Sequence, residues 1–270
     1  MTAQILNMAA GYKTVLEAGE GAPWLAMVHG MSGDHRVFSA QVAAFKARYR
    51  ILLVDLPGHG LASDVPGPFG QIELAAHVAG ALADAGAEPC HYWATHTGTA
   101  LGLLLATERA GRFRSMILEG AVLPGHAMPS VDRELERARD TARAAGVAAA
   151  CRQWFDEAAW FDVMRARPED CRAAAHWAIV ASFSGAPWLD TGAAAPVAPI
   201  DGRLVSLDVP VLLYNGEHDL ADFVDVADRL EALLPRVRRA TIAGAGGFPA
   251  WEFPARVNRL AEDFLSSLEA

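Results

Sequence analysis

The stretch WATHTGTALG, residues 93–102, joins an apolar run to a helical pattern through a short turn of small and polar residues. The helical pattern continues as TALGLLLATERAGRF over 99–113. Similar unbroken apolar runs predict strands over 24–30, 49–56, 90–96, 114–122 and 209–219. Runs without polar alternation are typical of a parallel sheet covered on both faces. Since a further helical pattern at 71–87 also lies between these runs, the sequence predicts an α/β fold with a doubly wound, mostly parallel sheet.

The apex of the turn within this stretch can be placed at either of two residues, which gives two registers of the turn. Ala94 and Gly98 flank His96 in the first register, and threonines flank Thr97 in the second. Because β-branched side chains fit a tight turn badly, we expect His96 at its apex. Ligands of open parallel sheets bind beyond the carboxyl ends of the strands, so this turn is a candidate site.

The alternation of strand and helix patterns is interrupted between residues 124 and 203. This segment is rich in Ala and Arg, has a helical pattern and ends in the loop-like stretch DTGAAAPVAPIDG (190–202). We expect a core domain made of 1–123 and 204–270, with 124–203 forming a helical cap, or lid, over the active edge of the sheet.

Composition narrows the possible partners. The chain has 270 residues and a formal net charge of −9, and its arginines between 133 and 152 are interleaved with acidic residues. An acidic chain without a basic patch is a poor partner for nucleic acid. The sequence has neither a signal-peptide pattern nor an apolar run long enough to span a membrane. Three cysteines without a Cys-x-x-Cys pair suit a reducing compartment. We therefore expect a cytoplasmic protein with no nucleic-acid or membrane partner, which could form a homo-oligomer.

Five landmarks follow predicted strands or precede the last predicted helix: HGMSGD (29–34), DLPGHG (55–60), ATHTG (94–98), GEHD (216–219) and AGAGGFPAWEFP (243–254). In type, order and spacing together they resemble the α/β-hydrolase superfamily over essentially the whole chain. That resemblance implies a mostly parallel sheet with a helical insertion. It also implies a Gly-x-Ser-x-Gly turn that exposes a nucleophile, and a catalytic histidine before the last helix.

Two positions depart from the superfamily pattern. His96 stands where the nucleophilic serine belongs, and Gly247, in GGFPAWEFP, stands where the catalytic histidine belongs. In the usual triad the histidine removes the proton of the nucleophile and later returns it. The resemblance therefore does not carry ordinary serine-hydrolase chemistry to this chain.

The carboxylates of the pattern are retained. Asp219 matches the acid that follows the last long strand, and Glu119 lies at the strand end that supplies the acid in haloalkane dehalogenases. Either could orient His96 and stabilise its imidazolium form. Alternatively, Asp219 is the N-cap of the helix that follows it, and Glu119 is a solvated or salt-bridged strand end. By position, the backbone amides of Met31 and Thr97 correspond to the oxyanion hole. We expect the nearby Asp34 to act as a helix N-cap and not as a site residue.

Aromatic residues are the candidate lining of a substrate pocket, since such pockets are mostly apolar. The candidates are Trp154, Trp160, Trp177, Trp188 and Phe248, although each tryptophan could simply hold the cap on the core. His126 or His176, both in the cap, could supply the missing base. No metal-ligand spacing and no phosphate-binding loop is present, so the sequence implies no metal and no organic cofactor.

Three functional hypotheses remain open at this point. In the first, a hydrolase uses His96 as general base or nucleophile on a small, mainly apolar carbonyl substrate. In the second, a lyase, decarboxylase or isomerase uses His96 to move a proton while the oxyanion hole holds an enolate. In the third, the protein binds a small molecule without catalysis. Fold alone does not choose among them.

Overall fold

A computed structural model describes residues 11–269. Its centre is a seven-stranded sheet in the order β1-β3-β2-β4-β5-β6-β7, in which β1 is antiparallel to β3 and the other pairs are parallel. The strands are β1 (Tyr12–Val15), β2 (Trp24–Val28), β3 (Arg50–Val54), β4 (Cys90–Thr95), β5 (Phe113–Glu119), β6 (Val211–Gly216) and β7 (Val237–Ile242). The structure confirms the α/β-hydrolase fold and its mostly parallel sheet.

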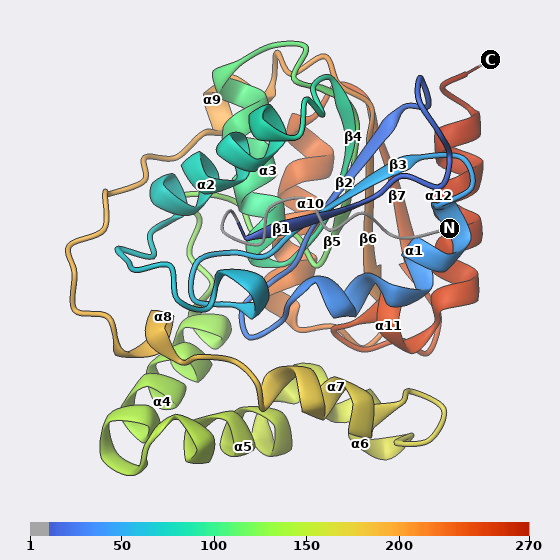
Figure 1. Ribbon diagram of the computed structural model, residues 1–270. Helices are drawn as coiled ribbons and strands as arrows, with labels where there is room; N and C mark the ends of the chain where they lie inside the picture. The colour runs from blue at the N-terminus through green and yellow to red at the C-terminus, as the bar shows by residue number, and fades with distance from the viewer. Residues whose placement is uncertain (1–10, 270) are drawn as a thin grey trace.

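Helices cover both faces of this sheet (Figure 1). The α-helices are α1 (Ser39–Phe45), α2 (Gln71–Asp84), α3 (Thr97–Glu108), α4 (Pro129–Ala145), α5 (Val147–Glu157), α6 (Asp162–Ala166), α7 (Ala173–Val180), α8 (Ala186–Leu189), α9 (Asp201–Leu204), α10 (Ala221–Leu233), α11 (Pro249–Glu252) and α12 (Pro254–Ser266). Short 3₁₀ helices occupy His35–Phe38, Gly60–Ala62 and Ala159–Phe161.

Two separate layers of apolar side chains follow from the alternation of side chains along each strand. On β4, Tyr92 and Ala94 point into the layer that packs against α2, α3 and α10. Trp93, between them, points into the opposite layer, which packs against α1 and α12. Both faces of the strand are therefore buried, which explains why its sequence is apolar throughout.

Between β5 and β6, helices α4 to α8 and the 3₁₀ helix Ala159–Phe161 pack together at one end of the sheet, where they appear in green to yellow in Figure 1, whereas α9 lies apart from them. We call α4 to α8, with this 3₁₀ helix, the inserted helices. Asp222, on core helix α10, accepts hydrogen bonds from the backbone amides of Ser130 (2.7 Å) and Val131 (3.0 Å). These amides lie in the first turn of α4 and have no partner within the helix. A core side chain therefore fixes the start of the insertion.

All five predicted strands are present, each within a few residues of its expected limits. The sequence did not predict the two edge strands, β1 and β7. β7 reads VRRATI and is mostly half-buried, and β1 has only four residues. An edge strand covered on one side only lacks the unbroken apolar run that identifies a central strand.

Candidate active site

The turn between β4 and α3 places His96 at its apex. The backbone of His96 has φ 45° and ψ −116°, a conformation that L-residues rarely adopt. Gly98, two residues later, is required by close contact, because a Cβ atom there would lie 2.5 Å from the carbonyl oxygen of Val28. The first register is therefore the one that the structure adopts, and the turn lifts the His96 side chain above the carboxyl end of β4.

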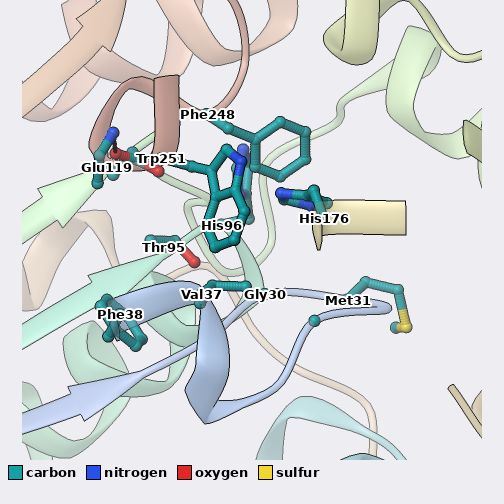
Figure 2. A pocket seen from close by; sticks show the side chains of 12 residues that line it. Gly30, Met31, Val37, Phe38, Thr95, His96, Glu119, His176, Phe248 and Trp251 are labelled. Carbon is teal, nitrogen blue, oxygen red and sulfur yellow. Dashed lines mark hydrogen bonds between the residues drawn. The ribbon is translucent and has the colours of Figure 1, made fainter. Parts of the chain in front are cut away.

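His96 lines two neighbouring cavities, and Met31 and Phe248 also line both. The first, which we call the Glu119 cavity, is closed by Thr95, Glu119, Ala250, Trp251, His176 and residues of the 30–38 segment (Figure 2). The second, which we call the tryptophan cavity, is lined by Thr97, Val122, Val131, Leu135, Trp154, Trp160 and Phe223. The tryptophan cavity is the larger and is almost wholly apolar, whereas titratable groups gather around the Glu119 cavity.

The imidazole of His96 lies in an apolar setting. Phe223 and Phe248 approach it with ring centroids 5.0 and 5.1 Å away. Burial lowers the pKa of His96 to about 4, and a hydrogen bond with the backbone of Gly247 opposes part of this shift. At neutral pH the ring is therefore uncharged and free to accept a proton.

The two backbone amides expected to form an oxyanion hole are unpaired. Within residues 11–269, no group accepts a hydrogen bond from the amide of Met31 or of Thr97. Thr97 is the first residue of α3, and amides in the first turn of a helix lack partners within that helix. Both residues also line the tryptophan cavity. Two free donors are thus available beside His96 for an oxygen that gains negative charge.

Glu119 lies at the end of β5 and is only 1% exposed, so the interpretation as a solvated or salt-bridged strand end is wrong. Its carboxyl group accepts a hydrogen bond of 2.7 Å from the amide of Ala250 and forms another with the hydroxyl of Tyr214. Burial raises the pKa of Glu119 to about 8, so the group is mostly protonated at neutral pH. It lines the same cavity as His96 but is an acid there, not a carboxylate.

Asp219 follows β6 and has its own partners. Its carboxyl group accepts hydrogen bonds of 2.9 Å from the side chain of Asn215 and from the amide of Leu220, the residue at the N-cap of α10. Burial raises the pKa of Asp219 to about 7. Asp219 therefore lies one residue before the N-cap of α10, and the alternative that it is itself the N-cap is wrong.

The predicted pairing of His96 with a carboxylate is not formed. Across the described part of the chain, neither Glu119 nor Asp219 makes a hydrogen bond or an ion pair with His96. The physical reason is that backbone amides and neighbouring polar side chains already occupy both carboxyl groups.

Gly247 shows why the usual histidine is missing from its loop. A Cβ atom on Gly247 would lie 2.6 Å from the Cβ atom of Trp160, on the inserted helices. The amide of Gly247 also donates a hydrogen bond to the carbonyl of Trp160. The insertion therefore packs directly onto the backbone at this position, and no side chain fits between them.

A second imidazole reaches the Glu119 cavity from the inserted helices. His176 on α7 is 2% exposed, and its ring centroid lies 4.9 Å from the ring centroids of Phe248 and Trp251 (Figure 2). Burial, together with the nearby His96, lowers its pKa to about 3. His126, the other histidine weighed from the sequence, is exposed and lines neither cavity.

The aromatic candidates divide into two groups. Trp154, Trp160 and Phe248 line the tryptophan cavity, as expected for pocket residues. Trp177 and Trp188 do not, which corrects the prediction for both. Trp188 is fully buried against Trp154 and Phe183, and Trp177 lies beneath the guanidinium of Arg152. These two side chains pack the insertion and do not reach the site.

Asp34 is the N-cap of the 3₁₀ helix His35–Phe38, as predicted, since its side chain accepts a hydrogen bond from the amide of Arg36. Residues 11–269 hold no group of three or more His, Cys, Asp or Glu side chains arranged to bind a metal ion. None of the helices in that range is both long enough and apolar enough to cross a membrane.

Comparisons with known proteins agree with this architecture. Residues 23–254 match the family model described as alpha/beta hydrolase fold, so the chain belongs to the α/β-hydrolase fold family. A similar protein is 3-oxoadipate enol-lactonase 1 of Acinetobacter baylyi, which is 25% identical over 200 residues, 74% of this chain and 73% of that protein.

Solved structures share the fold at low identity. MenH from S. aureus superposes with a TM-score of 0.83 at 19% identity, covering 96% of this chain and 99% of that one. The enol-lactonase from Burkholderia xenovorans LB400 superposes with a TM-score of 0.77 at 22% identity, covering 94% and 95% of the two chains. These similarities concern the fold and say nothing about the residues at the turn.

Proposed function

We propose that the protein is an enzyme that hydrolyses a small, mainly apolar ester or lactone, with His96 as general base in place of the usual serine and histidine. The observation that carries the proposal is the position of His96: an uncharged imidazole at the apex of the turn, beside the free amides of Met31 and Thr97. In this proposal residues 124–203 form the cap, and Trp154, Trp160 and Phe248 surround the substrate.

The proposed reaction proceeds in two stages. A water molecule transfers a proton to a ring nitrogen of His96 while its oxygen bonds to the carbonyl carbon. The electron pair of the C=O bond moves to the carbonyl oxygen, which the two free amides stabilise. When the intermediate collapses, the bond to the leaving oxygen breaks and that oxygen takes the proton back from His96. Direct attack by His96, which would form an acyl-imidazole, is the alternative route within the same function.

The carboxyl groups have different roles in this proposal from those of a triad. Glu119 accepts the hydrogen bond of the Ala250 amide and so keeps that segment in place. Because it is protonated at neutral pH, it faces the cavity as an acid. Asp219 fixes the loop between β6 and α10.

Because neither Glu119 nor Asp219 supports the imidazolium of His96, the proton affinity of the base is low. We therefore expect activated esters and lactones, which need the least help from a base, to be the better substrates.

A panel of activated esters and lactones, assayed with wild type, His96→Ala and His126→Ala, tests the proposal. The lactones are included because the A. baylyi relative is named an enol-lactonase. We expect His96→Ala to lower kcat/KM by about 10²-fold or more, as loss of a general base does, and His126→Ala to leave it within twofold. An unchanged rate in His96→Ala would refute His96 as the base. Mass spectrometry of an acylated His96 during turnover would favour direct attack over activated water.

A second candidate is proton transfer without hydrolysis, by a lyase, decarboxylase or isomerase. It is favoured by one observation: a protonated carboxyl group and an uncharged imidazole, Glu119 and His96, line one cavity as an acid and a base. Exchange of a carbon-bound substrate proton with D₂O that depends on His96, on carbonyl compounds that the enzyme does not hydrolyse, would support this candidate over the first.

A further inference from the structure

The Glu119 cavity lies next to the apolar tryptophan cavity, and His96 belongs to both. The titratable side chains of Glu119 and His176 line only the first of them. The volume of the Glu119 cavity is about 20 Å³, and roughly 10–15 Å³ suffices for one water molecule. It is too small for a substrate with several carbon atoms. The tryptophan cavity, lined almost wholly by apolar side chains, suits the apolar body of a substrate.

One side chain in the Glu119 cavity lacks the partner that its burial requires. His176 is 2% exposed, and its Nδ1 is buried without a hydrogen-bond partner in the part of the chain that the structure describes. Phe161, Phe248 and Trp251 surround its ring, and none of them offers an acceptor to it. Leaving a polar group buried and unpaired destabilises the folded protein, so a polar molecule in the cavity would remove this penalty.

Other polar groups converge on the same space. Thr95 and Glu119 line the cavity at the ends of two adjacent strands, and His96 lines it from the turn (Figure 2). Buried water usually makes two to four hydrogen bonds to groups of this kind. A hydroxyl, a carboxyl and two imidazoles can together both donate to and accept from one water molecule.

We propose that the Glu119 cavity is a binding site for a single water molecule, held by His176 next to His96, and that this water is the one activated for attack on the substrate. In this arrangement His176 is a positioning residue that acts through the water. It brings an imidazole from the inserted helices to a site where the Gly247 loop has no room for one. The proposal rests on the proposed hydrolytic function for its second half, whereas the binding site itself does not.

A high-resolution crystal structure of the unliganded wild type tests the binding site without any assay. We expect one ordered water within about 3.2 Å of a ring nitrogen of His176. An empty cavity, or a cavity filled by a rearranged side chain, would refute the site.

Three variants test the role of His176 in turnover: His176→Leu, His176→Asn and, as control on an exposed position of the insertion, His126→Leu. We expect His176→Leu to lower kcat by about 10²-fold with KM changed less than threefold, because the water and not the substrate loses its partner. His176→Asn retains a donor and an acceptor, so it should recover at least tenfold of that loss. His126→Leu should remain within twofold of wild type.

The outcomes separate the two proposals. A raised KM with unchanged kcat in His176→Leu would show that His176 contacts the substrate and would refute the water site. Unchanged kcat and KM would refute any role of His176 in turnover. Water in the cavity of a protein that turns over no ester or lactone would refute the proposed function while leaving the site. Turnover by a protein with an empty cavity would refute the water site while leaving the proposed function. If His176→Leu fails to fold, the crystal structure and His176→Asn still decide the question.

Discussion

The imidazole of His96 differs from the histidine of a usual triad because no carboxylate within residues 11–269 supports it. Apolar rings and the end of β4 surround it, and its pKa falls to about 4 through burial. A base that is never charged near neutral pH is always available, but it holds its proton weakly. The substitution at this one position therefore changes the range of pH over which the site can work.

The pH dependence of kcat/KM on a good ester substrate follows from this pKa. Protonation of His96 removes the base, so kcat/KM should fall as the pH drops through about 4. At about pH 5.5, where the ring is almost wholly uncharged, kcat/KM should be close to its maximum. Circular dichroism at each pH shows whether the fold is intact. An acid limb near 6.5, the ordinary value for histidine, would contradict the burial that we describe for this ring.

At the scale of elements, specific contacts join the inserted helices to the core. Asp222 on α10 caps α4, and Trp160 packs on the backbone of Gly247. The indole of Trp251, on α11, donates to the carbonyl of Cys171, just before α7. Because His176 lies on α7, these contacts also decide where the second imidazole stands relative to His96.

Removal of the Asp222 carboxylate should loosen the start of the insertion. Asp222→Ala leaves the amides of Ser130 and Val131 unpaired, so we expect it to lower the free energy of unfolding by about 1–2 kcal/mol. Urea unfolding measures this loss. Asp225→Ala, on an exposed position of the same helix, is the control and should change stability by less than about 0.5 kcal/mol. Equal losses in both variants would show that α10 itself is affected.

At the scale of the whole molecule, buried acidic groups gather at the carboxyl edge of the sheet. Burial raises the pKa of Glu119 to about 8 and those of Asp219 and Glu252 to about 7. Between the ordinary value of about 4.5 and the raised value, the folded chain holds protons that the unfolded chain has lost. These three carboxyl groups therefore contribute less stability as the pH rises through this window.

The contribution of Glu119 is isolated by comparison with Glu119→Gln, because the buried histidines, Asp219 and Glu252 titrate in both proteins. Between pH 6.5 and 8 its carboxyl should cost the wild type on the order of 2 kcal/mol of stability. Glu119→Gln cannot ionise and should unfold with a flatter pH dependence, so that its relative stability improves as the pH rises. Urea unfolding at pH 6.5, 7.25 and 8 measures the difference. Parallel curves for the two proteins would contradict the raised pKa.

The fold and the position of the turn could be predicted from the sequence because both depend on local pattern. Buried parallel strands need apolar side chains on both faces, and a tight turn needs small residues such as Gly98 at fixed spacing. Short edge strands such as β7 escaped prediction because one side of them is not covered. The unusual residues at the site, His96 and Gly247, could likewise be recognised from their places in the order of landmarks.

The partners of each site residue were decided only by the tertiary structure. The sequence was compatible with a pair between His96 and either Glu119 or Asp219. In the structure, backbone amides, one of them from the distant Ala250 segment, occupy both carboxyl groups. The sequence offered no reason to prefer His176 over His126, and only the packing of α7 buries His176 beside the turn. Periodicity shows which face of a helix is buried. It does not show which side chain of another segment will meet that face, because such contacts depend on the distances between elements far apart in the chain.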